Sequence, residues 1–132
     1  VEQVMSTEIV TVSQDDPLEL AANLMVWQKI RHLPVEDDEN KIVGLISQRH
    51  LVRLLQNWGS INGDRPVFVH QVMQKDVRTV LPETLTKDAI KIMRQDRLGC
   101  LPVQKHETLV GLVTESGILE RLSTLLEEKL LE

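Results

Sequence analysis

Two short apolar segments of the chain each end with a residue that carries a hydroxyl group. They read Gly44-Leu45-Ile46-Ser47 and Gly111-Leu112-Val113-Thr114. In both cases the residues that follow predict a helix, and the unpaired amides of a helix N-terminus favour an anion such as phosphate. The hydroxyls of Ser47 and Thr114 can equally be helix N-caps, a role that needs no ligand. Both interpretations fit the pattern, because the same helix start serves both.

Basic side chains gather around the first of these segments. Arg31 and His32 precede it, and Arg49, His50 and Arg53 follow it. Together they predict a locally basic surface that can hold a phosphate within an acidic chain. For Arg49 and Arg53, on one predicted helix, a solvated helix face is the favoured alternative. Histidine is the side chain type that commonly changes charge near neutral pH, so His32 and His50 are also expected to make binding depend on pH. For each histidine taken alone, a surface position or a satisfied hydrogen bond is the favoured alternative.

Catalytic and metal-binding interpretations are less well supported. Cys100 and His106 suggest a nucleophile and a base, but a small buried hydrophobe is the usual role of a cysteine in a predicted strand. No oriented third residue accompanies the pair. The acidic run at residues 37–39 lacks the spacing and turn glycine of a calcium loop, and a lone cysteine makes no zinc site by itself. We therefore expect neither an enzyme nor a metal protein.

The composition narrows the class of molecule. The chain has 132 residues, of which 42% are hydrophobic and 27% are charged, as in ordinary globular domains. The net charge of -5 disfavours binding to a nucleic acid polymer. No apolar run approaches the roughly 20 residues of a membrane span, and no signal peptide is recognisable, so we expect a cytoplasmic protein without direct membrane insertion. The first residue is Val1, which we interpret as the start of an excised piece.

The sequence contains an internal duplication. Residues 1–5 (VEQVM) correspond to residues 69–73 (VHQVM), and at the same offset Thr11 falls on Thr79. The same offset places LPV at 33–35 on LPV at 101–103. We predict a first repeat over residues 1–58, a linker over 59–68 and a second repeat over 69–132.

Each repeat predicts the element order β-α-β-β-α. First strands are expected at residues 9–12 and 77–80. In the first repeat, Asp16 is expected to cap a helix that has Pro17 at its first position. The first helices should end near Ile30 and Leu98, and each is followed by a hairpin, at residues 33–46 and 101–113.

The last helices are expected from about Gln48 to Trp58 and from about Ser116 to the C-terminus. The second of them carries an apolar stripe. The stripe comprises Ile118, Leu119, Leu122, Leu125, Leu126 and Leu130.

These motifs resemble the cystathionine-β-synthase (CBS) family. The second repeat shows VMQKDVRTVLPETL, LGCLPVQ and VGLVTESG, and the first shows VMSTEIVTV, RHLPV and VGLISQRH. The resemblance covers nearly the whole chain apart from the linker. It implies an α+β fold in which two β-α-β-β-α CBS repeats are related by a pseudo-twofold axis and packed through their sheets, a Bateman module. Such modules commonly form disc-like homodimers.

The resemblance also implies a regulatory function. Family members hold adenosine-containing ligands, such as AMP, ADP, ATP, S-adenosylmethionine or NADH, in clefts between the repeats, and they control an attached or associated enzyme or transporter domain. The candidate ligand-binding residues are Thr11, Arg31, His32, Ser47, Arg49, His50, Thr79, Cys100 and Thr114.

The two repeats differ from the family pattern at one position. In the family motif G-h-h-[TS]-x-x-D, where h is apolar, the final Asp accepts hydrogen bonds from ribose, and here His50 and Gly117 stand in its place. Only the first repeat has basic residues nearby, so we expect at most one working cleft. The alternative is a ligand-independent structural dimerisation module with degenerate clefts.

Overall fold

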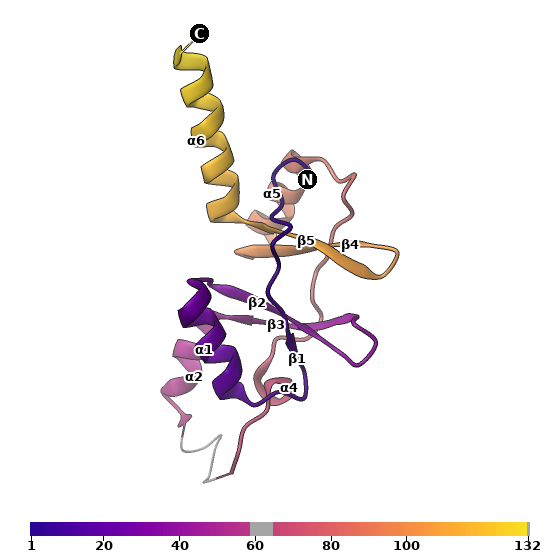
Figure 1. Ribbon diagram of the computed structural model, residues 1–132, viewed down its shortest axis with the longest axis vertical. Coiled ribbons are helices and arrows are strands. Elements are labelled where there is room, and N and C mark those ends of the chain that lie inside the picture. The colour runs from indigo at the N-terminus through magenta and orange to yellow at the C-terminus, as the bar shows by residue number, and fades with distance from the viewer. Residues whose placement is uncertain (59–64, 132) are drawn as a thin grey trace. The chain divides into compact units, whose positions relative to one another are not determined.

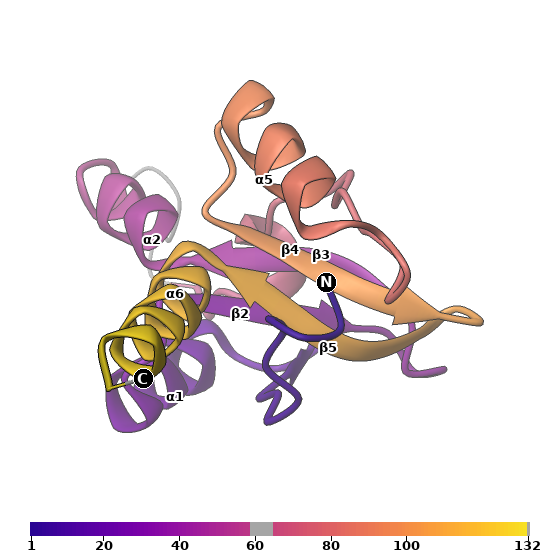
Figure 2. The ribbon, with the colours of Figure 1, turned by 90° about the horizontal axis from the view of Figure 1, so that it is seen from above.

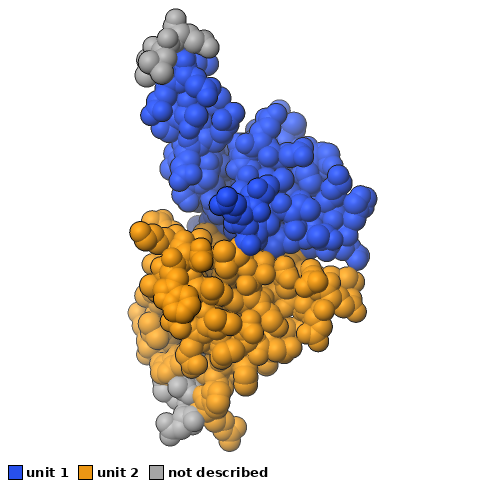
Figure 3. All heavy atoms as spheres, in the orientation of Figure 1, with its two compact units in different colours: residues 1–9, 78–132 blue, residues 10–77 orange. Residues whose placement is uncertain are grey.

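The computed structural model describes residues 1–58 and 65–131, and the chain divides into two compact units (Figure 3). Unit 1 contains residues 1–9 and 78–132, and unit 2 contains residues 10–77. The units therefore do not coincide with the sequence repeats. Unit 2 contains most of the first repeat and the opening segment of the second repeat. Unit 1 contains most of the second repeat and the opening segment of the first repeat. We call residues 1–5 and 69–73 the leader segments.

Unit 2 is built around a three-stranded sheet (Figure 1). β1 (Val12–Ser13) runs parallel to β2 (His32–Glu36), which pairs antiparallel with β3 (Ile42–Ser47). The helix α1 (Leu18–Gln28) connects β1 with β2, and α2 (Gln48–Leu55) follows β3. A single turn, α4 (Val69–Val72), lies in the leader segment.

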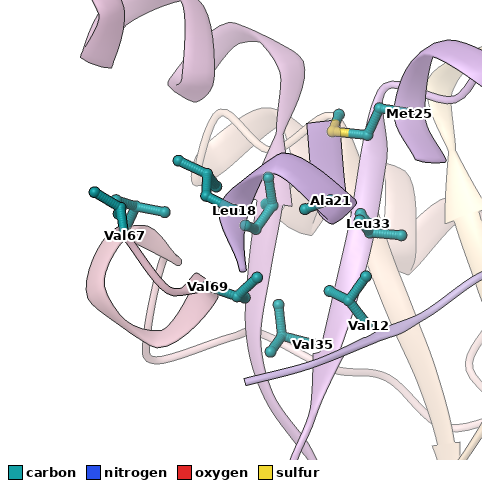
Figure 4. Close-up of a cluster of buried hydrophobic side chains, with 10 residues drawn as sticks. Val12, Leu18, Ala21, Met25, Leu33, Val35, Val67 and Val69 are labelled. Carbon is teal, nitrogen blue, oxygen red and sulfur yellow. The ribbon is translucent and has the colours of Figure 1, made fainter. Parts of the chain in front are cut away.

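The core of unit 2 lies between α1 and the sheet (Figure 4). Leu18, Ala21 and Met25 recur at helical spacing, so they share the buried face of α1. The sheet contributes Leu33 and Val35, which are fully buried. The remaining buried members of this cluster are Val12, Ile46, Val67, Val69 and Val72.

Unit 1 repeats this plan with the hairpin of β4 (Cys100–Lys105) and β5 (Thr108–Thr114). The helix α5 (Thr86–Gln95) lies against one face of the hairpin (Figure 2), and α6 (Glu115–Leu131) follows β5. The buried cluster contains Val1, Val80, Ala89, Met93, Leu101, Val103 and Val113. No helix of the described residues is long and apolar enough to span a bilayer.

Each unit is completed by a leader segment from the other repeat. Leu45 and Gln74 exchange two backbone hydrogen bonds of 3.0 and 2.9 Å, and Ser6 and Leu112 exchange two of 2.9 and 3.0 Å. Beside these bridges, a Cβ added to Gly44 would lie 2.4 Å from Met73 Sδ. The glycine therefore leaves space for the methionine. The exchange of these segments between the units was not predicted from the sequence.

The methionine of the other leader segment has the same relation to its glycine. A Cβ added to Gly111 would lie 2.3 Å from Met5 Sδ. Glycine and methionine thus form an equivalent close contact in each unit.

The predicted hairpins are confirmed, but the predicted first strands are too long. β1 has two residues, and in unit 1 only Val80 forms a parallel bridge, with Val103. A side chain closes a turn directly after each: Asp16 Oδ2 accepts from the Ser13 amide at 2.9 Å, and Thr84 Oγ1 accepts from the Leu81 amide at 3.1 Å. These turns lead the backbone away from the sheet.

The predicted cap of α1 is wrong by one residue. Pro17 is the N-cap, and the Asp16 carboxylate accepts a hydrogen bond from the Ser13 amide instead of from the helix. The helix ends are confirmed within a few residues: Lys29 and Arg97 are left-handed at φ 54° and 53°, just before the predicted endpoints Ile30 and Leu98.

The last helices also differ slightly from their predicted bounds. α2 ends at Leu55, before the predicted Trp58, and α6 begins at Glu115, one residue earlier than predicted. Residues 59–64 of the predicted linker, Glu132 and the side chain of Leu130 lie outside the described residues. The end of the linker belongs to the core of unit 2, since Val67 is buried and its carbonyl accepts from the Leu18 amide at 2.9 Å.

Candidate ligand-binding site

The candidate site of unit 2 is built on the junction between β3 and α2. Ser47 is the N-cap of α2, and its Oγ accepts from the His50 amide at 3.2 Å. The Gln48 amide donates to the Arg31 carbonyl at 2.8 Å, which ties the helix start to the residue before β2. The N-cap interpretation of Ser47 is confirmed, and its contact with a ligand stays a prediction.

The junction between β5 and α6 in unit 1 has the same geometry. Thr114 Oγ1 accepts from the Gly117 amide at 3.0 Å, and the Glu115 amide donates to the Gly99 carbonyl at 3.3 Å. The duplication has thus kept both the side-chain cap and the backbone tie of each helix start.

The strand register brings the remaining candidates to these junctions. His32 is paired with Ser47 across β2 and β3, and Cys100 is paired with Thr114 across β4 and β5. Cys100 therefore occupies in unit 1 the place of His32 in unit 2. In unit 2, the structure collects Arg31, His32, Ser47, Arg49 and His50 at one end of the hairpin.

Thr11 and Thr79 lie at the edge of this arrangement. Each is half-buried and directly precedes a buried valine, Val12 or Val80. Because β1 runs parallel to β2, Thr11 lies toward the end of the sheet that carries His32. Neither hydroxyl forms a hydrogen bond to another side chain or to the backbone in the described part of the chain, and their ligand role remains a prediction.

The charges at the two helix starts are opposite. The first turn of α2 has no acidic residue and carries the exposed Arg49, with exposed Arg31 just before β2. The first turn of α6 carries the exposed Glu115. The partial positive charge of a helix N-terminus favours an anion, and a carboxylate at that end competes with one. The junction of unit 2 is therefore the better anion site.

His50 stands where the family motif has a carboxylate, and its imidazole has a structural contact. Its Nε2 lies 2.9 Å from the Val72 carbonyl oxygen, which can only accept, so this nitrogen donates. The bond ties α2 to the leader segment of the second repeat. Sequence reasoning missed this contact, because the two residues come from different repeats.

Cys100 contributes an uncharged side chain to the β5–α6 junction of unit 1. Its side chain is buried, and burial raises the pKa of the thiol to about 12, so it is not a thiolate near neutral pH. His106 lies in the turn at the far end of β4, about 20 Å along the strand from Cys100. The two residues therefore do not form a nucleophile and base pair.

The acidic run at residues 37–39 serves the β2–β3 turn. Asp37 Oδ1 accepts from the amides of Glu39 and Lys41 at 2.8 and 3.0 Å. This local bonding gives Asp37 a role in the turn without a cation, which agrees with the predicted hairpin turn. No group of three or more potential metal ligands gathers anywhere in the described part of the chain.

Comparison with known proteins gives a consistent picture. The model of the CBS domain matches residues 1–57 and 69–124. The chain is 33% identical to inosine-5'-monophosphate dehydrogenase of Methanocaldococcus jannaschii over 91% of its own length, and it spans 23% of that enzyme. The structure is similar to that of a putative acetoin utilization protein from Vibrio cholerae, with a TM-score of 0.83, 32% identity and coverage of 100% and 96% of the two chains.

Two further solved structures of similar fold contain ligands. The CBS domain pair of protein MJ0100, in complex with 5'-methylthioadenosine and S-adenosylmethionine, has a TM-score of 0.80 and 21% identity, over 92% of this chain and 98% of that chain. CBSX2 in complex with AMP has a TM-score of 0.83 and 24% identity, over 95% and 96%. At these identities the two likenesses establish the fold.

Proposed function

The chain belongs to the CBS-domain family, and we propose that it is a regulatory module that binds an adenosine-containing ligand and controls an attached or associated enzyme or transporter domain. The observation that carries this proposal is the helix start of unit 2, where a capped N-terminus without acidic residues lies beside Arg31 and Arg49. The adenosine ligands of MJ0100 and CBSX2 support the ligand class. We propose no catalytic activity for the chain, which spans only 23% of the related dehydrogenase.

Within this class, we propose a phosphate-bearing ligand such as AMP, ADP or ATP for unit 2. Its phosphate would face the α2 amides and the guanidinium of Arg31, an arrangement that gives charge-assisted hydrogen bonds. His50 occupies the position of the aspartate that binds ribose in the family motif, and its Nε2 donates to the Val72 carbonyl. We therefore expect the phosphate contacts to supply most of the affinity.

A thermal-shift panel tests the proposal. AMP, ADP, ATP, S-adenosylmethionine and NADH are each added at millimolar concentration, and at least one should raise the melting temperature. A ligand at 100 times its dissociation constant adds about 2.7 kcal/mol of stability. A melting temperature that none of the five compounds raises would contradict ligand sensing.

The second candidate function is ligand-independent dimerisation, with the homodimer as the partner. Four exposed leucines on α6 favour it. It is also favoured because His50 and Gly117 replace the aspartate that binds ribose in the family motif. It predicts a dimer in the absence of any added compound. Sedimentation that finds only monomers at micromolar protein would exclude it.

A further inference from the structure

The helix α5 carries three cations on its exposed side. Lys87, Lys91 and Arg94 recur at the spacing i, i+4 and i+7, so they lie along one face over about 10 Å of helix. All three side chains are exposed. Ala89 and Met93 are buried on the opposite side of the helix, which packs against the β4–β5 hairpin (Figure 2). We call the three cations the α5 cationic stripe.

The stripe has no partner within its own unit. None of its three side chains forms an ion pair in the described part of the chain, with Asp88 or with any other residue. Asp96, just beyond the end of α5, is paired instead with Arg78, at 3.2 Å between the carboxylate oxygen and the guanidinium nitrogen. The charges of the stripe are therefore available to another molecule.

The stability of α5 does not explain the stripe. Lys87 and Lys91 are four residues apart and Lys91 and Arg94 are three apart, and like charges at these spacings destabilise a helix. Lys87 also lies in the first turn, where the positive end of the helix dipole disfavours a cation. The binding of an anionic partner would remove both of these unfavourable effects.

The first repeat has no such stripe. At the offset that places Ala21 on Ala89, the three positions of the stripe are occupied in α1 by Glu19, Asn23 and Val26. The buried sides of the two helices are alike, since each has an alanine and a methionine at the same positions. The repeats therefore share the residues that pack the helix and differ on its outer face, so the stripe is a feature of unit 1 alone.

The surroundings of the stripe suit a polypeptide partner. The three cations line a shallow hollow together with Ile90 and Gln95. Because all of these side chains come from one helix, the hollow does not enclose a small molecule as a ligand cavity does. The half-buried Ile90 adds an apolar contact beside the charges, and α5 has no aromatic side chain on which a nucleic acid base could stack. These features favour an acidic polypeptide over a nucleotide or a nucleic acid.

We propose that the α5 cationic stripe docks an acidic segment of the protein that this module regulates. On an acidic helix, carboxylates at the spacing i, i+4 and i+7 extend over the same length as the stripe, so that each carboxylate faces one cation. An apolar side chain beside them would contact Ile90. The inference rests on the proposed regulatory function, because that function supplies the partner. It does not depend on which adenosine-containing ligand the module binds.

A synthetic helix provides the first test. The probe is a fluorescent alanine-based peptide of about 20 residues, long enough to be helical, with three glutamates at this spacing and one leucine beside them. The matched peptide has glutamines in place of the glutamates. Fluorescence anisotropy at low salt should show that the full chain binds the glutamate peptide about tenfold more tightly, and high salt should abolish the difference. Equal binding of the two peptides at low salt would overturn the proposal.

Charge reversal tests whether the peptide binds at the stripe. Lys91→Glu places a carboxylate in the middle of the stripe and should weaken binding of the glutamate peptide about tenfold. The matched control Lys129→Glu makes the same change at an exposed lysine of α6, in the same unit, and should leave the affinity within about twofold. Circular dichroism checks that both variants are folded. Equal weakening by the two variants would indicate an effect of net charge and overturn the stripe as the docking surface.

An oligonucleotide tests the class of partner. A single strand of about 20 thymidines should bind more weakly than the glutamate peptide. If it binds more tightly and Lys91→Glu weakens that binding, the stripe is a nucleic acid surface and the proposal of an acidic protein partner is wrong.

The nucleotide thermal shift separates this inference from the proposed function. A protein that AMP stabilises but that does not bind the glutamate peptide would overturn docking at the stripe and leave ligand sensing intact. A protein that binds the peptide but that none of the adenosine compounds stabilises would overturn ligand sensing and leave docking at the stripe intact.

Discussion

The β3–α2 junction of unit 2 and the β5–α6 junction of unit 1 have the same backbone and different chemistry. Ser47 and Thr114 cap their helices with the same hydrogen bond, and each helix start is tied to the residue before the first strand of the hairpin that precedes it. The side chains around the two caps are cationic in unit 2, and in unit 1 they are a carboxylate and a buried thiol. Features common to both copies therefore serve folding, and features found in one copy are the candidates for binding.

The largest expected difference between the two junctions is in thiol reactivity. Burial raises the pKa of Cys100 to about 12, so its thiolate fraction at pH 8 is about three orders of magnitude below that of an exposed cysteine. Labelling with a thiol reagent should be at least 100-fold slower in the native protein than in urea. In the variant His32→Cys, the new cysteine at the equivalent half-buried position should react faster than Cys100. If Cys100 and the cysteine at position 32 were labelled at equal rates in the native protein, the two junctions would not differ in this respect.

The same pKa predicts how alkaline pH acts on stability. The raised pKa keeps the folded thiol neutral while the unfolded thiol ionises above about pH 8.5. The free energy of unfolding should therefore fall as pH rises from about 9 toward 12, and it should be unaffected by this group at lower pH. Cys100→Ala should reduce this alkaline loss in urea titrations at pH 7 and pH 10.

The glycines next to the leader segments should respond equally in both units. Gly44→Ala and Gly111→Ala would each place a Cβ 2.4 or 2.3 Å from a methionine sulfur, so the methionine must move. Overpacking of this kind costs about 1–3 kcal/mol. Urea denaturation should show losses in this range for both variants, and Met73→Ala should relieve part of the loss in the Gly44→Ala background. A loss confined to one variant would mean that the leader contact is not equivalent in the two units.

Local sequence patterns predicted most of the fold, and they failed where distant segments meet. The hairpins were predictable because β-branched runs flank polar turns, and the ends of α1 and α5 because the apolar periodicity stops there. The VEQVM and VHQVM segments were recognised as a repeat, but nothing in their residues says which sheet they join. The bond of His50 to Val72 was missed for the same reason, since it depends on that exchange.

The candidate site was predictable to a similar degree. Register pairing of His32 with Ser47 and of Cys100 with Thr114 follows from the hairpins, so those residues could be placed together from sequence. The acid at the start of α6 was assigned no role, because the predicted helix began at Ser116 and left Glu115 outside it. An error of one residue at a helix boundary thus concealed the clearest electrostatic difference between the units.

Arg31 provides the most direct test of the difference in ligand binding. Its exposed guanidinium has an uncharged counterpart, Gly99, in unit 1. Arg31→Ala should raise the dissociation constant of AMP about tenfold, because one charge-assisted hydrogen bond is lost. The fold should be unchanged, since only the backbone carbonyl of Arg31 is used by α2. Calorimetric titration measures the effect, with Arg53→Ala as the control that removes the same charge from the exposed face of α2. Equal losses in both variants would indicate a general charge effect and remove Arg31 from the site.

Glu115 should give the smallest effect, and it tests the comparison from the side of unit 1. Its carboxylate lies in the first turn of α6, where it opposes any phosphate that approaches the helix amides. In the Arg31→Ala background, Glu115→Gln should tighten residual AMP binding about two- to fivefold, as expected for one charge at a helix terminus. Glu120→Gln, further along the same helix, should leave binding unchanged. If Glu115→Gln has no effect on AMP binding, the two junctions differ in binding only through the basic residues of unit 2. The carboxylate of Glu115 then does not contribute to the difference.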